Sequence, residues 1–144
     1  MSRFVLDTSV TVAWCFSDEG TRFTEGVLDM MAADSEALVP SVWPLEVANA
    51  LVTAERRKRI SVAQASAFLM RLSGFSISID PIRMDRAFNQ ILYNARERKL
   101  TAYDAAYLEL ALREGLPLAT IDRDLRHAAN SLGLPLLEVP NPRS

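Results

Sequence analysis

The chain has 144 residues, of which 49% are hydrophobic and 24% charged, and its formal net charge is −2. These values are typical of a globular protein and predict one domain over residues 1–144, without a general attraction to nucleic acid, so any contact with RNA or DNA requires a local basic patch. Since no apolar segment is long enough to cross a bilayer or to act as a secretory signal, we expect a cytoplasmic protein that contacts no membrane.

In the first half of the chain, short apolar runs that favour strands alternate with segments of helical period. Strands are predicted at residues 4–6 and 37–40. Between them, one shared apolar face predicts a helix that packs on the sheet, formed by Phe23, Val27, Met30 and Met31. After the second strand, the pattern predicts a helical hairpin that begins at Ser41 and turns at residues 60–61, with helices at about residues 41–59 and 62–72.

The second half of the chain continues this alternation. Residues 76–79 and 118–121 are predicted strands, and residues 135–139 form a weaker last one. The apolar stripe of residues 84–95 predicts another helix on the sheet, and residues 103–114, which are apolar nearly all round, predict a buried helix. The whole pattern is that of an α/β fold, with a parallel sheet of four or five strands and helices on both faces.

Four acidic residues lie in otherwise apolar contexts, namely Asp7, Glu46, Asp104 and Asp122. Taken singly, the three aspartates have an ordinary interpretation as helix caps or first-turn residues. Glu46, in the second turn of its predicted helix and at the margin of the apolar stripe, is most simply a solvated side chain. However, helix starts that follow parallel strands collect along the edge of the sheet where ligands bind, and this favours convergence of the acids.

Carboxylates that converge require a cation or protons, because two of them about 4 Å apart repel by about 4 kcal/mol at an effective dielectric of 20. The single cysteine, Cys15, and the single histidine, His127, exclude a zinc site built on several such ligands. Ligation by oxygen alone suits Mg²⁺ or Mn²⁺, whose usual partner in enzymes is a phosphate oxygen. The residues therefore indicate metal-assisted phosphoester chemistry, with three hydroxyls as candidates to bind a ligand or the scissile phosphate: Thr8, Ser9 and Thr120.

Basic residues form two groups. One group lies at the end of a predicted helix and consists of Arg56, Arg57, Lys58 and Arg59. Its preferred interpretation is a solvated helix end, where the helix dipole favours cations, and the second interpretation is a contact with phosphate. The second group flanks the acidic residues and is predicted to position RNA phosphates without reading the base sequence: Arg96, Arg98, Lys99, Arg123 and Arg126.

Four segments of the chain carry a resemblance to a known family: FVLDTSVTVAW, VPSVWPLEVANAL, LTAYDAAYLELA and LATIDRDLRHAA. In this order, and over nearly the whole chain, they resemble the PIN-domain ribonucleases, in particular the VapC-type toxins of bacterial toxin–antitoxin systems. No acidic position departs from the family pattern. The resemblance implies a three-layer α/β/α sandwich with a four- to five-stranded, mainly parallel sheet.

The resemblance also implies a function, that of a metal-dependent endoribonuclease. It implies that Mg²⁺ or Mn²⁺ activates a water molecule that hydrolyses an RNA phosphodiester, leaving a 5′-phosphate and a 3′-hydroxyl. Within one centre, Asp7 and Asp104 would be the primary metal ligands, Asp122 a further or second-metal ligand, and Glu46 the group that orients or activates the water. The implied partners are a second copy of the chain and a cognate antitoxin protein, through which alone the complex would contact operator DNA.

Two other functions stay open at this point. One is a PIN-like binding or regulatory module with little catalysis, which the loss of an acidic residue would favour. The other is a phosphohydrolase in which Asp7 is the nucleophile, which would call for a second acid two positions later, where Ser9 stands. The presence of all four acids favours the nuclease.

Overall fold

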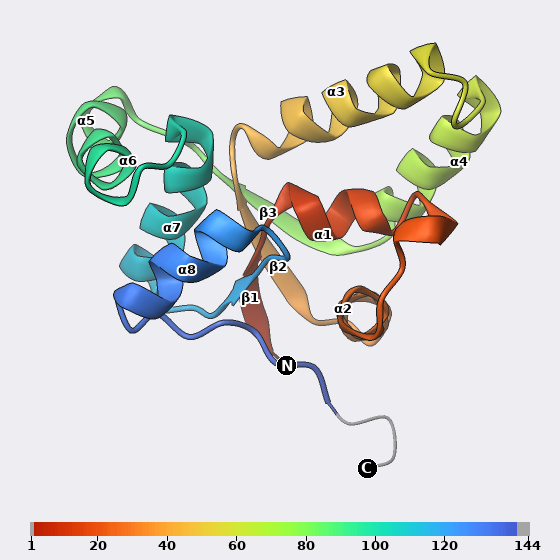
Figure 1. Cartoon of the computed structure of the whole chain (residues 1–144). Coiled ribbons are helices and arrows are strands. Elements are labelled where there is room, and N and C mark those ends of the chain that lie inside the picture. The colour runs from red at the N-terminus through yellow and green to blue at the C-terminus, as the bar shows by residue number, and fades with distance from the viewer. Residues whose placement is uncertain (1, 141–144) are drawn as a thin grey trace.

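A parallel sheet of four strands lies at the centre of the protein, which a computed structural model describes over residues 2–140 (Figure 1). The strands run in the order β3-β2-β1-β4, and every neighbouring pair is parallel, as predicted. Strand β1 is buried on both faces, which explains its uninterrupted apolar run. The bounds are β1 Arg3–Leu6, β2 Glu36–Pro40, β3 Ser76–Asp80 and β4 Leu118–Ala119.

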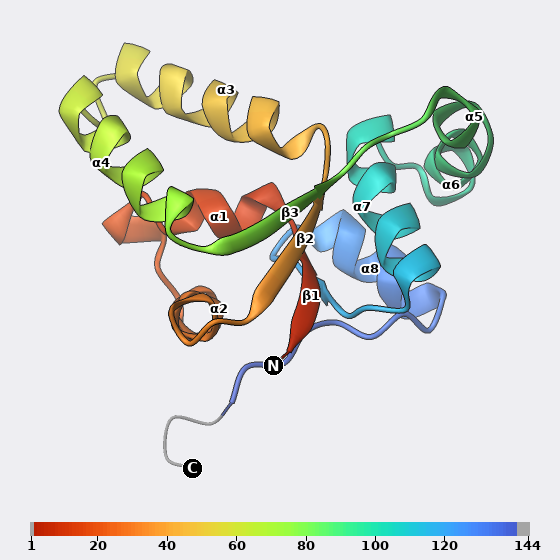
Figure 2. The same ribbon diagram turned by 180° about the vertical axis from the view of Figure 1, so that it is seen from behind.

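Helices cover both faces of this sheet, which confirms the predicted three-layer α/β/α sandwich (Figure 1, Figure 2). One layer contains α1 (Thr8–Ala13), a 3-10 turn (Ser17–Glu19), α2 (Arg22–Ala32), α3 (Trp43–Arg56) and α4 (Val62–Ser73). The other contains α7 (Ala102–Glu114) and α8 (Arg123–Ser131), and α5 (Met84–Arg86), a π-helical turn (Ala87–Ile91) and α6 (Leu92–Arg98) lie outside α7 on this side. Over residues 2–140, no helix is long and apolar enough to span a membrane.

The last two predicted strands are shorter than the sequence indicates. Strand β4 ends at Ala119 because Thr120 turns the chain, its hydroxyl accepting a hydrogen bond from the N–H of Asp122 at 3.0 Å. Instead of a weaker fifth strand, residues 135–139 form one parallel bridge, between Leu136 and Leu118. The sheet of the described residues therefore has four strands.

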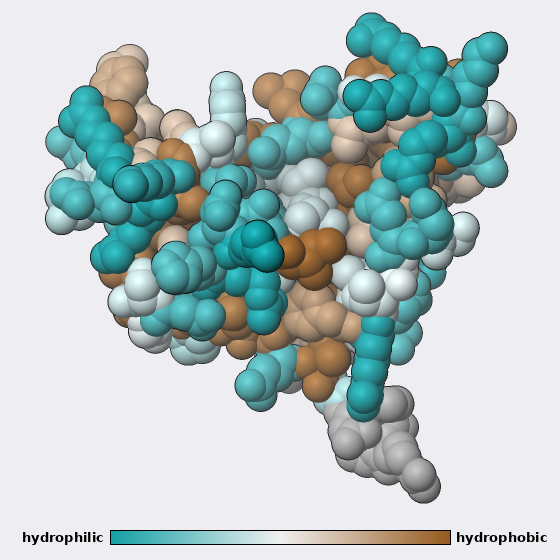
Figure 3. All heavy atoms as spheres, in the orientation of Figure 1, coloured by the Kyte–Doolittle hydropathy of each residue, from teal (hydrophilic) through white to brown (hydrophobic). Residues whose placement is uncertain are grey.

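The predicted helical hairpin is present, with a corrected start. Helix α3 begins at Trp43 and not at Ser41, because the Ser41 hydroxyl accepts from the N–H of Ile82 at 3.1 Å and does not cap the helix. At the turn, Ser61 caps α4 through a reciprocal capping box with Gln64. The two helices extend away from the sheet, and the hairpin tip is hydrophilic (Figure 1, Figure 3).

Helix α7 is the buried helix that the sequence predicts. Residues 105–111 are all buried, with Tyr107 and Leu108 fully inaccessible to solvent. The helix ends at Gly115, whose φ of 64° is the left-handed conformation that favours glycine. Because α7 contacts β1, β2 and β4, it occupies one face of the sheet.

The prediction that the helix of residues 84–95 packs on the sheet is wrong, because α7 already covers that face. This helix instead forms an outer layer against α7, with Ile91 only 3% exposed in a small apolar cluster with Ala105 and Ala106. Met84 and Phe88 of the same predicted stripe are 73% and 66% exposed. An apolar face in the sequence therefore indicated burial for only part of this helix.

This packing predicts unequal costs for two truncations on the same helix. Ile91→Ala is expected to lower the free energy of unfolding by about 2 to 4 kcal/mol, because it leaves a cavity against α7. Phe88→Ala should change it by less than about 0.5 kcal/mol, since the ring is mostly in solvent. Urea unfolding of both variants measures the difference, and equal large losses would show that the whole stripe is buried.

Candidate active site

The four acidic side chains lie on four different elements that begin at the carboxyl edge of the sheet. Asp7 follows β1 and precedes α1, and Asp122 stands between β4 and α8. Glu46 and Asp104 lie in the first turns of α3 and α7. The four lie near enough to one another that, besides burial, the negative charges of Asp7, Asp122 and Glu46 raise the pKa of Asp104. This is the convergence that parallel strand ends predict.

Asp7 is the buried member of this group, with 4% of its surface exposed. It stands at the N-cap position of α1, but its side chain makes no capping hydrogen bond, so the cap interpretation is wrong for this residue. Its Oδ2 instead accepts hydrogen bonds from the hydroxyls of Ser9 at 2.6 Å and Thr120 at 2.7 Å. Burial raises the pKa of Asp7, which these two hydrogen bonds partly offset, and the charges of Glu46 and Asp122 raise it further.

Glu46 is fixed by hydrogen bonds and is not the solvated residue that its position on the helix margin indicates. Its Oε1 accepts from the hydroxyl of Tyr107 at 2.5 Å and from that of Thr8 at 3.0 Å. Because α3 starts two residues later than predicted, Glu46 lies in the first turn and not in the second. Burial raises the pKa of the Tyr107 phenol, and the hydrogen bond to Glu46 raises it further.

Asp104 and Asp122 both have a capping relationship with their helices. The N–H of Asp104 donates to the hydroxyl of Thr101 at 3.1 Å, so Thr101 caps α7, while the Asp104 carboxylate is half-buried. Burial, followed by the charges of Asp7, Asp122 and Glu46, raises the pKa of Asp104 to about 6. For Asp122 the cap interpretation is confirmed, because its Oδ2 accepts from the N–H of Leu125 at 2.9 Å.

The spacing of the acids limits how a metal ion could be bound. Within residues 2–140, no three acidic, cysteine or histidine side chains are close enough together to hold one ion jointly. A closed cage of protein ligands is therefore not formed by the described residues. A site that offers only one or two carboxylates to an ion suits Mg²⁺, which usually keeps several water ligands and binds through one or two carboxylates. The charge repulsion that raises the pKa of Asp104 is what a cation would relieve.

Hydroxyl groups support the carboxylates in this site. Ser9 and Thr120 donate to Asp7, and Thr8 donates to Glu46, so in this structure these hydroxyls hold the acids. Their predicted contact with a ligand or the scissile phosphate stays a prediction. Tyr107 was not singled out from the sequence. The signal for it is a tyrosine one turn after Asp104 in a helix that is apolar nearly all round, since a buried tyrosine hydroxyl usually finds a hydrogen-bond partner.

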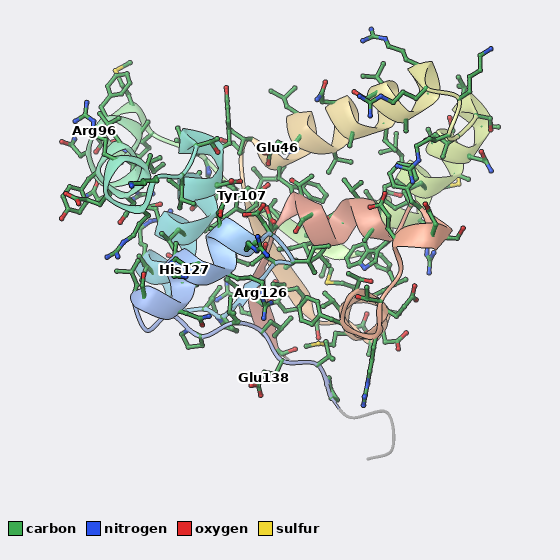
Figure 4. The ribbon with its side chains drawn as sticks, viewed as in Figure 1. Glu46, Arg96, Tyr107, Arg126, His127 and Glu138 are labelled. Atoms are coloured by element: carbon green, nitrogen blue, oxygen red, sulfur yellow. The ribbon has the colours of Figure 1, made fainter. Side chains whose placement is uncertain are left out.

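Several basic residues predicted to contact phosphate are engaged inside the protein. Arg126 donates to the carbonyl of Thr120 at 3.0 Å, and Arg98 donates to the hydroxyl of Ser131 at 3.2 Å. Arg59 forms ion pairs with two acids of the 3-10 turn and lies over the ring of Phe16 at 4.1 Å. Arg96 lies on the outer layer, away from Glu46 and Tyr107 (Figure 4). The remaining exposed cations of the first group are Arg56, Arg57 and Lys58.

The fold and this site together define a class of protein, an α/β/α sandwich that gathers acidic side chains at the carboxyl edge of a parallel sheet. The sequence matches the family model of the PIN domain over residues 4–131. The chain therefore belongs to the PIN domain family, which confirms the resemblance carried by the four sequence segments.

Known proteins of this family are similar to the chain to different degrees. The exonuclease VapC9 of Pyrobaculum aerophilum is 41% identical over 81 residues, which are 56% of this chain and 57% of that protein. The match thus spans little more than half the length of this relative. A crystal structure of a protein from the same organism has a TM-score of 0.67 at 26% identity, covering 88% of this chain and 84% of that one.

Two further solved structures share the fold at low sequence identity. VapBC2 of Rickettsia felis, bound to a DNA fragment from its promoter, has a TM-score of 0.66 at 13% identity, over 96% of this chain and 99% of that one. VapC20 of Mycobacterium tuberculosis, a toxin that cleaves the sarcin–ricin loop, has a TM-score of 0.62 at 17% identity, over 95% and 99%. At these identities the likeness establishes the fold.

The raised pKa of Asp104 predicts a pH-dependent cost to the stability of the metal-free protein. Its pKa is about 6 in the folded state against an ordinary value of 3.8, so the folded protein holds the proton more tightly and stability falls as pH rises between these values. Asp104→Asn removes the cost and should raise the free energy of unfolding at about pH 7.5 by about 1 to 2 kcal/mol, after discounting for solvent screening of a half-exposed group.

At a pH below both values the variant and the parent should be equally stable, because Asp104 is then neutral in both states. Urea unfolding in the presence of EDTA at the two pH values measures the effect, and the exposed Asp124→Asn is the matched control. A variant that gains no stability at the higher pH would contradict the raised pKa of Asp104.

Proposed function

We propose that this PIN-domain protein is a metal-dependent endoribonuclease and the toxin component of a toxin–antitoxin system. The observation that carries the proposal is the convergence of Asp7, Glu46, Asp104 and Asp122 at one edge of the sheet, where burial and the charges of the other three raise the pKa of Asp104. Family membership supports nuclease activity, and the names of two relatives, an exonuclease and a toxin that cleaves an RNA loop, point to phosphodiester cleavage.

In this proposal, Asp7 and Asp104 hold the metal ion. The hydrogen bonds of Asp7 within the described residues all go to Oδ2, which leaves Oδ1 available as a ligand. The ionised form of the half-buried carboxylate of Asp104, whose pKa is raised, would be stabilised by a nearby cation. When bound, Mg²⁺ or Mn²⁺ supplies positive charge that lowers the pKa of water and stabilises the transition state of phosphodiester hydrolysis. PIN domains are typically metal-dependent, which supports this assignment.

The other two acids have different tasks. Glu46 presents a carboxylate that is held at one oxygen, and its second oxygen is free to accept a proton from the attacking water. Asp122 is oriented by its capping bond to Leu125, which leaves it as a ligand of a second metal ion or as a fixed negative charge beside the first. The aspartyl-nucleophile alternative is disfavoured, because the second acid that it calls for two positions after Asp7 is replaced by Ser9, whose hydroxyl donates to Asp7.

Four conservative substitutions test this centre. In RNA cleavage with Mn²⁺, each of Asp7→Asn, Glu46→Gln, Asp104→Asn and Asp122→Asn is expected to lose at least about 100-fold in kcat, because each removes a metal ligand or the group that handles water. EDTA should abolish cleavage by the parent protein. The exposed Asp124→Asn serves as the matched control and should keep its activity.

The same assay on linear and circular RNA separates two modes of cleavage. The relative named as an exonuclease makes exonucleolytic degradation the second candidate. An endoribonuclease cuts the circle, whereas an exonuclease degrades only the linear form. Full activity of the Asp104→Asn protein would overturn the proposed centre, and cleavage confined to linear RNA would overturn the endonuclease assignment alone.

We further propose a protein partner, a cognate antitoxin encoded beside the chain, together with a homodimer of the chain itself. The solved VapBC2 complex with promoter DNA supports the antitoxin. A second support is an apolar groove of about 350 Å³ between α3, α4 and β3, lined by residues that include Trp43, Leu51, Leu69 and Ile79. Exposed apolar surface of this kind is typical of a site for a protein partner.

Reconstitution with the small protein of the adjacent reading frame tests these partners. The complex is expected to lose ribonuclease activity and to shift operator DNA on a gel, while the chain alone cleaves RNA and leaves the DNA unshifted. Light scattering of the chain alone should give twice the mass of one copy. Binding of operator DNA by the chain alone, or full activity in the complex, would contradict the assignment.

A further inference from the structure

Tyr107 is a buried tyrosine whose hydroxyl reaches the acidic site (Figure 4). This hydroxyl lies 2.5 Å from Oε1 of Glu46 and 2.7 Å from the hydroxyl of Thr8, which in turn lies 3.0 Å from the same carboxylate oxygen. We propose that Tyr107 is a positioning residue that fixes the carboxylate of Glu46 for catalysis, an inference that rests on the proposed nuclease function.

The direction of these hydrogen bonds follows from the number of hydrogens available. An ionised carboxylate only accepts, and each hydroxyl carries one hydrogen. Tyr107 therefore donates to Glu46, and Thr8 donates either to Glu46 or to the oxygen of Tyr107. In both arrangements Oε1 of Glu46 is occupied, while Oε2 receives no hydrogen bond from residues 2–140. Tyr107 thus determines which oxygen of Glu46 faces the reaction.

Glu46 depends on this contact because its other surroundings restrain it little. It lies in the first turn of α3 beside Leu45, whose side chain is 74% exposed, and it is in no ion pair among the described residues. A glutamate in such a place keeps much rotamer freedom unless a fixed partner removes it. The ring of Tyr107 is fully buried in close-packed surroundings, so its hydroxyl is such a partner.

Tyr107 also connects Glu46 to the two acids proposed as metal ligands. It lies three residues after Asp104 on α7, so the two side chains share a face of the helix. Thr8, which contacts both Tyr107 and Glu46, directly follows Asp7 in the chain. One cluster of hydroxyls and carboxylates therefore joins the start of α1, the first turn of α3 and helix α7.

The variant Tyr107→Phe tests this role, because it removes the hydroxyl and keeps the buried ring. We expect kcat for RNA cleavage to fall about 10- to 100-fold, because the carboxylate of Glu46 is then no longer held in the orientation that general-base catalysis requires. The KM for RNA and the affinity for Mn²⁺ alone should change less than about twofold. Tyr93→Phe, a change of the same kind at a residue that is 63% exposed, is the matched control and should leave kcat unchanged.

A double-mutant cycle with Glu46→Gln separates positioning from a general structural role. If Tyr107 acts through the Glu46 carboxylate, adding Tyr107→Phe to Glu46→Gln should cost less than about twofold further in kcat. An equal loss in both backgrounds would overturn the proposal, and so would an unaffected kcat in the single variant. Thermal unfolding of each protein confirms that the measured proteins are folded.

A crystal structure of the Tyr107→Phe protein gives a second readout that does not depend on activity. The Glu46 side chain is expected to occupy more than one rotamer there, and a single unchanged rotamer would overturn its positioning by Tyr107. A parent protein that cleaves no RNA with Mn²⁺ would overturn the proposed function itself, whereas an active parent with an unaffected variant would overturn only the role of Tyr107.

Discussion

Repulsion between four carboxylates is the constraint on which the rest of this site depends. Asp7 is buried and Asp104 is half-buried, and both have a raised pKa because burial and neighbouring negative charge oppose ionisation. Hydrogen bonds from neighbouring hydroxyls stabilise the charged carboxylates. Ser9 and Thr120 bond to Asp7, and Thr8 and Tyr107 bond to Glu46. Each of these carboxylates is consequently held at one oxygen and open at the other, which is the state in which an acid can bind a cation or a water molecule.

The fold and the convergence of the acids could be predicted from the sequence for the same physical reason. Buried parallel strands are short uninterrupted apolar runs, and their carboxyl ends meet at one edge, so the places of Asp7 and Asp122 follow from the pattern alone. The comparisons confirm the family and the fold, since residues 4–131 match the PIN domain and a solved structure has a TM-score of 0.67. Glu46 and Asp104 were expected near this edge because helix starts collect there, and both lie in the first turns of their helices.

What could not be predicted depends on packing between distant segments. The hydroxyl of Tyr107 meets Glu46 across 61 positions of sequence, and that of Thr120 meets Asp7 across 113. Helical period likewise shows that residues 84–95 have an apolar face, but not which surface that face meets, and α7 takes the place on the sheet. The start of α3 was mispredicted for the same reason. Serine is a common helix cap, but the Ser41 hydroxyl accepts a hydrogen bond from the backbone N–H of the distant Ile82.

The distribution of the acids along the chain has a consequence for how the protein is made. Asp7 emerges with the first strand, whereas Asp122 stands after β4, the last strand of the sheet, and Tyr107 and Asp104 belong to a helix made shortly before it. During synthesis, the growing chain therefore lacks a complete group of acids until β4 and α8 have been added. The chemistry proposed for this site accordingly requires segments from the first strand to α8 to be made and folded together.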